Sequence, residues 1–442
     1  MIIETKKVDN HIPRLVEKKL EKYIDGIGSV LIEGPKLCGK THLGQRYTKS
    51  KFRLQDYSEN QIDNFLYIAN NNPIFDGPKP SLIDEWQLNN NIWDLVKVRI
   101  DQANENGQYI LTGSTRVSET KKRHDGSARI ARLRMWPLII SEILQKDPLQ
   151  WKLKLSDLFK SEVVPLGSNH YDQNWLNEIM VKGGWPQIYA KDTDHETFRI
   201  SYLDNIFNVE KRNHNLNHKL KTNLVKLVFA ALVRHNGKTI IIDTLLKDLE
   251  AKQSKIATNT LKKYLQYFDD LFLFFDLQIW PRIYRMDSKT RFQTRPKTYL
   301  VDPSLGLWQN DVTSSKKLLT KPGFDYGTYF ENLVIRDLMV YAQALDAHLY
   351  FYHEHDKYGI EIDAILELSD GSYGAIEIKW GGYEGIQKAI DSLLRFNKKM
   401  TANPKVGPAK FLMIITSCPD PNIGAYQTKD GIYVVPHQNL TI

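Results

Sequence analysis

The chain has 442 residues, of which 42% are hydrophobic, 11% aromatic and 25% charged, and its formal net charge at neutral pH is +8. This composition excludes a disordered or fibrous protein, and the length suggests two or three domains of roughly 100–200 residues each. The positive charge favours an anionic partner such as nucleic acid or nucleotide phosphate, although a lysine-rich surface accounts for it equally well.

No apolar run approaches the ~20 residues that a membrane span needs. The N-terminus, Met1–Lys7, lacks the order of charged, apolar and small segments that marks a signal peptide. The two cysteines, Cys38 and Cys418, lie far apart in sequence, so neither a disulfide framework nor a cysteine-based zinc site is indicated. We therefore expect a cytoplasmic protein with no membrane partner.

The first third of the chain has the order of elements that a phosphate-binding loop requires. The residue pattern predicts a helix over 13–24, an apolar strand over 29–33 and a helix over 43–47. Between the strand and the second helix lies a G-x-x-x-x-G-K-T motif, made of Gly34, Pro35, Lys36, Leu37, Cys38, Gly39, Lys40 and Thr41. Amides of such a loop point at the β-phosphate, Lys40 would reach the β- and γ-phosphates, and Thr41 would hold Mg²⁺. The sequence predicts an ATP site here.

Two later strands supply the acids and hydroxyls that such a site needs. A short buried strand ends in Asp84 and Glu85. Asp84 would position Mg²⁺ directly or through water, and Glu85 would polarise the attacking water, unless the two acids merely start the next helix. A further strand over 108–114 ends in small polar residues. By position, Thr112 or Ser114 there would sense the γ-phosphate.

The stretch 129–137 alternates, so that as a strand it places Arg132 and Arg134 on one face and Leu133 and Met135 on the other. One of these arginines would contact the nucleotide or act as an arginine finger. The alternative is that both are exposed on an edge strand.

The middle of the chain is predominantly helical. The turn Gly183–Pro186 is interpreted as a packing corner rather than a site. Further on, helices are predicted over 221–233, 241–249 and 256–271, followed by an apolar strand over 271–275. This order indicates a winged-helix arrangement whose second helix would enter a DNA groove. Asp269 and Asp270 do not suit a DNA-facing helix end, so a module that connects domains or mediates self-association is an equal alternative.

The last third has the order helix, strand, hairpin, helix. The pattern predicts helices over 329–342 and 389–396 and strands over 347–352, 359–368 and 374–379. In the hairpin, Asp363 and Glu377 lie on adjacent strands, and Glu377 and Lys379 point to the same face. Two carboxylates and a lysine make a site for Mg²⁺ or Mn²⁺, with Glu331 of the preceding helix as a further acid. This is the D…E-x-K arrangement of restriction-endonuclease-like enzymes; the alternative is a salt-bridge cluster.

With these residues in place, nearly the whole chain resembles a family of bacterial and archaeal AAA-type ATPases fused to a C-terminal domain of unknown function, number four-one-four-three. The resemblance rests on the segments 34–41, 84–85, 112–115, 126–137, 183–186, 301–305, 330–334, 361–363 and 377–379. It implies an AAA-like ATPase, a winged-helix linker and a restriction-endonuclease-like C-terminal core. One departure is Trp136, where such proteins often carry arginine, and this leaves Arg132 or Arg134 as the finger.

We therefore predict an α/β chain with an AAA-like P-loop ATPase domain at 1–150, a helical and winged-helix-like linker at 151–315 and a restriction-endonuclease-like domain at 316–442. The leading hypothesis is an ATP-dependent protein that processes nucleic acid, with DNA the favoured partner and homo-oligomerisation possible. One alternative is a regulatory ATPase switch whose C-terminal domain cuts nothing and binds DNA or a protein. Another is a transcription factor that reads DNA through the winged helix.

Overall fold

The computed structural model describes residues 11–68, 70–116, 128–145, 152–160, 166–167, 171–191, 193–209, 220–282, 295–322, 324–354, 359–417 and 424–442. Three features of the sequence argument, Met1–Lys7, Gly126 and Cys418, lie outside these residues. Among the described residues, no helix has the length and apolar character needed to cross a lipid bilayer.

The chain forms two compact units. The first comprises Met1–Leu138, Trp185–Asp192 and Gln266–Leu273, and the second comprises Ile139–Gly184, Thr193–Leu265 and Phe274–Ile442. The second unit takes in both the middle and the C-terminal regions of the sequence. The division into three domains stays a prediction.

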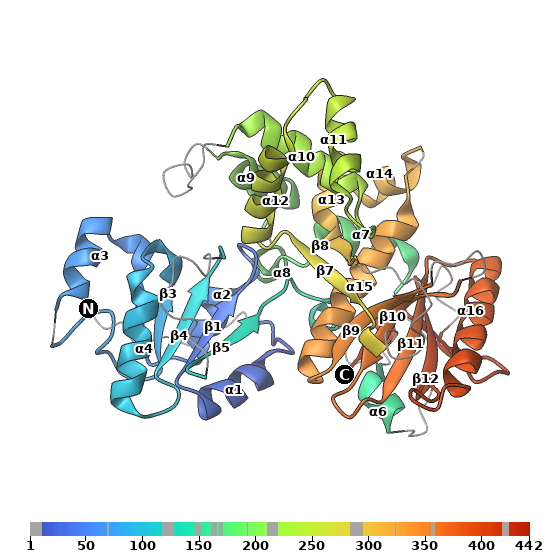
Figure 1. Cartoon of the computed structure of the whole chain (residues 1–442), viewed down its shortest axis with the longest axis horizontal. Helices are drawn as coiled ribbons and strands as arrows, with labels where there is room; N and C mark the ends of the chain where they lie inside the picture. Colours follow the sequence, from blue (N-terminus) through green and yellow to red (C-terminus); the bar gives the residue numbers. More distant parts are fainter. Residues whose placement is uncertain are drawn as a thin grey trace. The chain divides into compact units, whose positions relative to one another are not determined.

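The first unit is built on a sheet of five parallel strands in the order β2-β3-β4-β1-β5 (Figure 1). The strands are β1 (Ser29–Glu33), β2 (Ser50–Arg53), β3 (Ser81–Asp84), β4 (Tyr109–Gly113) and β5 (Ile130–Arg134). Its helices are α1 (Glu17–Gly26), α2 (Lys40–Arg46), α3 (Glu59–Leu66), α4 (Asn91–Ala103) and α8 (Pro186–Ala190). The predicted parallel α/β architecture of this part is therefore confirmed.

Both faces of this sheet are buried, which is why its strands read as near-continuous apolar runs. Val30 and Ile32 of β1 belong to a core cluster that includes Leu20 of α1 and Leu43 of α2. Leu31, between them, belongs to the cluster of the opposite face, together with residues of α4. Because the strands are parallel, their carboxyl ends share one edge, and the loops after β1, β3 and β4 meet there.

The second unit begins with helices. These are α5 (Ile140–Ile143), α6 (Leu155–Phe159), α7 (Gln173–Lys182), α9 (His195–Phe207), α10 (Thr222–Arg234), α11 (Ile242–Glu250), α12 (Thr258–Asp270), α13 (Pro303–Gln309) and α14 (Ser315–Thr320). The end of α12, from Gln266 onwards, belongs to the first unit. Two short strands, β6 (Leu153–Lys154) and β15 (Leu440–Thr441), pair with each other in parallel. The helices predicted from 221 onwards are present as α10, α11 and α12; their winged-helix role stays a prediction.

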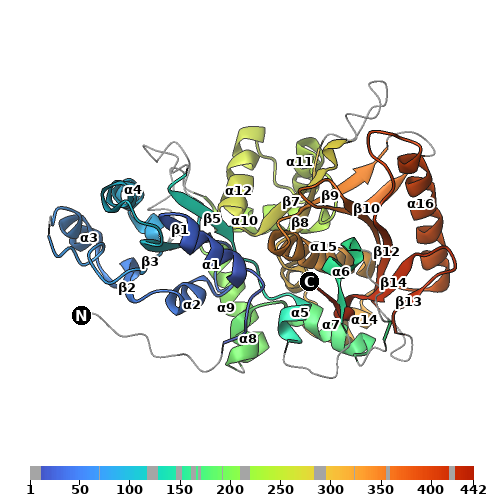
Figure 2. The same ribbon diagram turned by 90° about the horizontal axis from the view of Figure 1, so that it is seen from below.

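The remainder of the second unit is a mixed sheet of eight strands in the order β13-β14-β12-β11-β10-β9-β7-β8. The strands are β7 (Phe274–Ile279), β8 (Lys297–Leu300), β9 (His348–His353), β10 (Glu361–Glu367), β11 (Tyr373–Lys379), β12 (Phe411–Thr416), β13 (Tyr426–Gln427) and β14 (Tyr433–Pro436). Helices α15 (Tyr326–Ala344) and α16 (Tyr383–Thr401) lie on opposite sides of this sheet (Figures 1 and 2). The predicted hairpin is β10 and β11, which pair antiparallel.

A fully buried ionic cluster joins distant segments of the second unit. The guanidinium of Arg336 in α15 lies 2.5 Å from a carboxylate oxygen of Asp302 and 2.6 Å from one of Asp337. Asp337 also accepts a hydrogen bond from the amide of Ile140 and contacts His437 at 3.0 Å. Burial opposes ionisation of Asp337, but Arg336 and His437 outweigh it and lower the pKa of this carboxyl.

Candidate nucleotide site and candidate acidic site

The loop after β1 requires glycine at two positions. A Cβ atom on Gly34 would lie 2.1 Å from the carbonyl oxygen of Met135, closer than any side chain allows. Gly39 has a φ of +104°, a left-handed conformation that favours glycine, and it directly precedes the first turn of α2. The two glycines of the motif thus allow the loop to turn tightly next to the N-terminus of α2, the kind of position at which proteins bind anions.

Four polar residues of the predicted ATP site come together at the carboxyl edge of the sheet: Lys40, Thr41, Asp84 and Thr112. The Thr41 hydroxyl donates to a carboxylate oxygen of Asp84 at 2.7 Å, and the Thr112 hydroxyl donates to the same oxygen at 2.5 Å. The Lys40 ammonium donates to the carbonyls of Gly34 and Pro35 at 3.0 and 2.7 Å, within the concave side of the loop. Thr41 and Asp84 present adjacent hard oxygen donors, a donor set that fits Mg²⁺.

Glu85 has an unusual backbone. Its φ of +58° places it in the left-handed region, at a cost of about 1–2 kcal/mol for a residue with a side chain. The Glu85 amide donates to the Thr112 hydroxyl at 3.1 Å, and its carboxylate accepts from the Ser114 hydroxyl at 2.8 Å and from the Gln87 amide. Thr112, near the end of β4, and Ser114, just after it, therefore position Glu85. A strained backbone of this kind is typical of functional positions.

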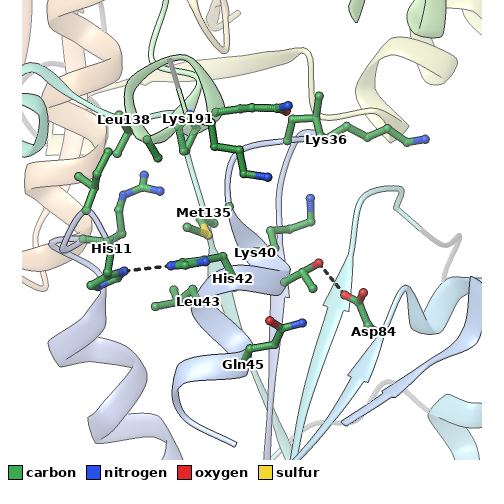
Figure 3. A pocket seen from close by; sticks show the side chains of 18 of the residues that line it. His11, Lys36, Lys40, His42, Leu43, Gln45, Asp84, Met135, Leu138 and Lys191 are labelled. Atoms are coloured by element: carbon green, nitrogen blue, oxygen red, sulfur yellow. Dashed lines mark hydrogen bonds between the residues drawn. The ribbon is translucent and has the colours of Figure 1, made fainter. Parts of the chain in front are cut away.

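A pocket of about 630 Å³ lies beside these groups. Its polar lining residues include Lys36, Lys40, Thr41, Asp84 and Glu85. Figure 3 shows the side chains of Lys36, Lys40 and Asp84. Other walls come from residues outside the G-x-x-x-x-G-K-T motif and the Asp84–Glu85 pair. They include Ile12, Leu138, Pro186, Gln187 and Lys191, together with the hydrogen-bonded, stacked pair His11 and His42 (Figure 3).

The interpretation of the Gly183–Pro186 turn was therefore incomplete. Trp185 is fully buried, as a packing residue should be, but Pro186 begins the short helix α8, and Pro186, Gln187 and Ala190 line the pocket. Proline at the first position of a helix has no special link to a binding site. The sequence signal was that of a structural turn only.

Arg14 also escaped the sequence reasoning. It precedes α1, is almost completely buried, and donates to the Cys38 carbonyl of the loop at 3.0 Å. Its second terminal nitrogen donates to the carbonyls of Trp136 and Pro137 at 2.7 and 3.3 Å. The guanidinium thus ties the phosphate-binding loop to the segment that follows β5. No local pattern around Arg14 distinguishes it from a helix-start arginine.

Neither Arg132 nor Arg134 is among the described residues that line the pocket. The Arg132 guanidinium lies 3.7 Å from Glu33 and 5.6 Å from the centre of the Trp93 ring. The Arg134 guanidinium lies over the rings of Trp136 and Phe272, and burial lowers its pKa to about 10. Their nucleotide-contacting role stays a prediction.

The acids at the end of α12 have a partner within the first unit. Arg116, which follows β4, forms an ion pair with Asp269 at 2.7 Å. Its amide donates to the Asp270 carbonyl at 2.9 Å. Asp269, an acid that does not suit a DNA-facing helix end, therefore pairs with an arginine of the same unit.

A second group of charged residues lies on the β10–β11 hairpin of the second unit. The register pairs Ala364 with Ile376, which brings Asp363 and Glu377 side by side. The pairing of β10 with β9 shifts by one residue between Ile362 and Ile365, an irregularity of the β-bulge type in the segment that contains Asp363. Bulges of this kind re-aim side chains next to active sites.

Lys379 joins the two carboxylates. Its ammonium lies 3.2 Å from Asp363 and 2.6 Å from Glu377, and Asp363 also accepts from the Ile378 amide at 2.8 Å. Burial and the charge of Asp363 raise the pKa of Glu377 to about 8. Burial acts in the same direction on Asp363, but Lys379 and Lys297 outweigh it and lower the pKa of Asp363. The three predicted residues are thus brought together.

Glu331 lies at the edge of this group. Its carboxylate accepts from the Tyr299 hydroxyl at 2.6 Å and lies 4.0 Å from the Lys297 ammonium. Burial, followed by the charge of Asp363, raises the pKa of Glu331 to about 7. Lys297 in turn forms an ion pair with Glu361 at 2.7 Å. Sequence reasoning missed Lys297 and Tyr299, because β8 precedes the hairpin by more than sixty residues.

The donors at this acidic site are carboxylates, which suit Mg²⁺ or Mn²⁺ in kind. Within the described part of the chain, however, no three acidic, histidine or cysteine side chains are grouped so as to hold a metal ion. Lys297 and Lys379 supply positive charge among the acids. The arrangement is equally that of a partly buried salt-bridge network.

Three ranges of the chain match known families. Residues 28–144 match the family described as AAA domain, residues 173–316 match Domain of unknown function (DUF8612), and residues 326–438 match Domain of unknown function (DUF4143). The restriction-endonuclease-like core that the resemblance implies stays a prediction.

Two curated relatives are similar over part of the chain. The uncharacterized protein MJ1544 of Methanocaldococcus jannaschii is 25% identical over 74% of this chain and 68% of its own length. An uncharacterized protein of Haemophilus influenzae is 22% identical over 54% of this chain, which spans about half (52%) of that relative.

Among solved structures, the Walker-type ATPase PABY2304 of Pyrococcus abyssi has a TM-score of 0.39 at 12% identity, over 66% of this chain and 94% of that one. The ORC1 protein of Aeropyrum pernix, solved in complex with DNA, has a TM-score of 0.25 at 11% identity, over 71% and 96%. Neither score is high enough to inform the function of this chain. The family recognised from the motifs is nonetheless confirmed by the matched ranges: the chain carries an AAA domain at residues 28–144 and a DUF4143 domain at residues 326–438.

Proposed function

We propose that the first unit binds ATP with Mg²⁺ and hydrolyses it. The observation that carries this proposal is the convergence of Lys40, Thr41 and Asp84 on one pocket, with Thr112 hydrogen-bonded to the same carboxylate oxygen as Thr41. These are the residue types that a P-loop site requires, delivered by three separate strands.

The residues have distinct roles in this reaction. The amides of the loop and the N-terminus of α2 bind the β-phosphate. The Lys40 ammonium, which bonds loop carbonyls at 2.7 and 3.0 Å, exchanges them for oxygens of the β- and γ-phosphates. Thr41 and Asp84 would hold Mg²⁺, which when bound supplies positive charge to those phosphates. Glu85 leaves Ser114 and accepts a hydrogen bond from the attacking water.

The roles of binding and hydrolysis are separable by experiment. We expect Glu85→Gln to keep ATP affinity within about threefold of wild type and to lower kcat on the order of a hundredfold or more, because a general base contributes 10²–10⁴-fold. Equilibrium binding of a fluorescent ATP analogue and phosphate release measure the two quantities. Glu59→Gln, an exposed position in α3, is the matched control. Unchanged kcat in Glu85→Gln would assign water activation to another group.

For the second unit we propose a metal-dependent phosphodiesterase site on DNA. Two observations favour this proposal: the register shift in the segment that contains Asp363, and the contacts of Asp363 and Glu377 with Lys379. Burying charged side chains on strands costs free energy, which a functional role would explain. Asp363 and Glu377 would hold Mg²⁺ or Mn²⁺, with Glu331 nearby; the metal when bound supplies charge at the scissile phosphate. Lys379 then orients water or stabilises the developing negative charge.

Plasmid cleavage with Mn²⁺ or Mg²⁺, with and without ATP, tests this second activity. Cleavage by wild type that is lost in Asp363→Asn and kept in Asp370→Asn, an exposed position in the same hairpin, supports a nuclease. Intact plasmid under every condition would favour the alternative, in which ATP state controls a C-terminal domain that binds DNA or a protein without cutting it. Size measurement with and without ATP tests the predicted homo-oligomer.

A further inference from the structure

The arginines of the described chain differ in how firmly they are bound to other groups. Two of them, Arg14 and Arg53, line the nucleotide pocket. Arg14 already donates to three backbone carbonyls. An arginine so committed serves the loop and has no remaining role toward a phosphate.

Arg53 is placed differently. It is the last residue of β2, and the register of the sheet pairs it with Asp84 at the end of β3. It therefore reaches the same edge as the acid that would hold Mg²⁺. Its backbone position is fixed by the ladder, as a preorganised catalytic group requires.

The contacts of the Arg53 guanidinium with acidic side chains are long. Its Nε lies 3.8 Å from Asp84 and its Nη1 lies 3.9 Å from Asp56, both longer than a hydrogen bond. The side chain is 40% exposed, whereas that of Asp84 is 2% exposed. With its amide oxygen turned toward the guanidinium, the exposed side chain of Gln55 accepts from the Nε of Arg53 at 3.3 Å and from its Nη2. Gln55 also lines the pocket, so a phosphate that reaches Arg53 would displace an exposed amide and not a buried partner.

We propose that Arg53 is the arginine of this ATP site, supplied by the same chain, and that it stabilises charge on the γ-phosphoryl group during hydrolysis. This inference rests on the proposed ATPase function.

In the reaction the water oxygen forms a bond to the γ-phosphorus while the bond from that phosphorus to the bridging oxygen breaks. The electron pair leaves with ADP, and the proton of the water passes to Glu85 and on to solvent.

The physical argument is electrostatic. Negative charge spreads over the γ-phosphoryl oxygens in the transition state, and a guanidinium held nearby binds that state more strongly than it binds ATP. Lys40 follows the loop after β1 and would contact the β- and γ-phosphates. Arg53 ends β2, the edge strand next to β3 with its Asp84, and would approach the γ-phosphate from that side. Arg132 and Arg134 lie outside the described pocket lining, which removes the geometric reason to prefer them.

The test compares Arg53→Ala, Arg53→Lys and Arg132→Ala with wild type, with Arg129→Ala as an exposed arginine control. We expect kcat of Arg53→Ala to fall on the order of a thousandfold. Affinity for a fluorescent, slowly hydrolysed ATP analogue should change less than about threefold, which also shows that the variant is folded. Binding of ADP with aluminium fluoride, a transition-state mimic, should be lost, and lysine should restore it only in part because it lacks the planar fork.

Other results would contradict the proposed role of Arg53. An Arg53→Ala enzyme with kcat within threefold of wild type would overturn the inference, as would a larger loss in Arg132→Ala. Equal loss of ATP affinity and of kcat, fully restored by lysine, would reduce Arg53 to a structural partner of Asp84. A wild-type protein without turnover would contradict the proposed function itself, whereas normal turnover in Arg53→Ala contradicts only the role of Arg53.

Discussion

Arg14 links the phosphate-binding loop to the rest of the first unit, and its removal should be costly. Arg14→Met keeps most of the apolar stem and deletes the guanidinium. The change removes bonds of 3.0 Å to Cys38 and of 2.7 Å to Trp136, and a weaker one of 3.3 Å to Pro137. Because Arg14 is only 7% exposed, water does not readily replace it.

The size of the effect follows from these bonds. A hydrogen bond to a charged group contributes about 1.5–3 kcal/mol, and buried carbonyls left without a donor add to the loss. Counting the two short bonds, we expect the free energy of unfolding of the first unit to fall by about 3–6 kcal/mol. ATP affinity should fall on the order of tenfold, since the Cys38 carbonyl belongs to the loop that we propose binds phosphate.

Urea unfolding followed by tryptophan fluorescence, with Trp86 and Trp93 as reporters in the first unit, measures this change. The matched control is Arg129→Met. Arg129 forms a 3.0 Å ion pair with Asp101, but both side chains are more than 40% exposed, so its loss should cost less than about 1 kcal/mol. Equal losses of unfolding free energy in the two variants would contradict this prediction, because they would show that the burial of Arg14 does not affect stability.

Three further predictions concern local packing and charge. Gly34→Ala should abolish ATP binding in a fluorescence titration, because the added Cβ meets the Met135 carbonyl; wild-type affinity would contradict this. Burial lowers the pKa of Lys79 to about 8, so between pH 8 and about 10.4 the unfolded chain holds more protons and stability rises with pH. Lys79→Met should remove that slope in urea titrations, and an unchanged slope would count against it. Arg336→Met leaves two buried carboxylates without their cation and should cost about 3–5 kcal/mol of the second unit's stability by the same method, whereas a loss below 1 kcal/mol would show the cluster is dispensable.

The sequence predicted what local pattern determines. β1, the loop, and the acids after β3 follow from short-range signals: an apolar run, fixed glycines and adjacent charges. The hairpin of β10 and β11 follows in the same way from two alternating runs and a turn. In each case the residues that meet are close in sequence or lie at equivalent ends of parallel strands.

What escaped prediction depends on long-range packing. Arg14 reaches Trp136 across 122 residues, and the wall of the pocket made by Pro186 comes from beyond the AAA domain match. Lys297 meets Glu331 and Glu361 only because β8 joins the same sheet as the hairpin. No spacing rule connects such residues, since their proximity is set by the folded topology and not by the periodicity of one element.

Arg132 and Arg134, whose role at the nucleotide stays a prediction, show a related limit of local pattern. Alternation along β5 places side chains on two faces but does not say which face looks onto the nucleotide edge. Arg53 sits at the end of its strand, where parallel strands place binding groups, but a single arginine after a short strand carries no motif.

The central claim is that Lys40 and its loop form an ATP-hydrolysing site. The most direct measurement is phosphate release from ATP with Mg²⁺ by wild type, Lys40→Ala and Lys18→Ala, the last an exposed lysine of α1. We expect turnover in wild type and in Lys18→Ala, and a loss on the order of a hundredfold or more in Lys40→Ala. Hydrolysis by Lys40→Ala at the wild-type rate would contradict it.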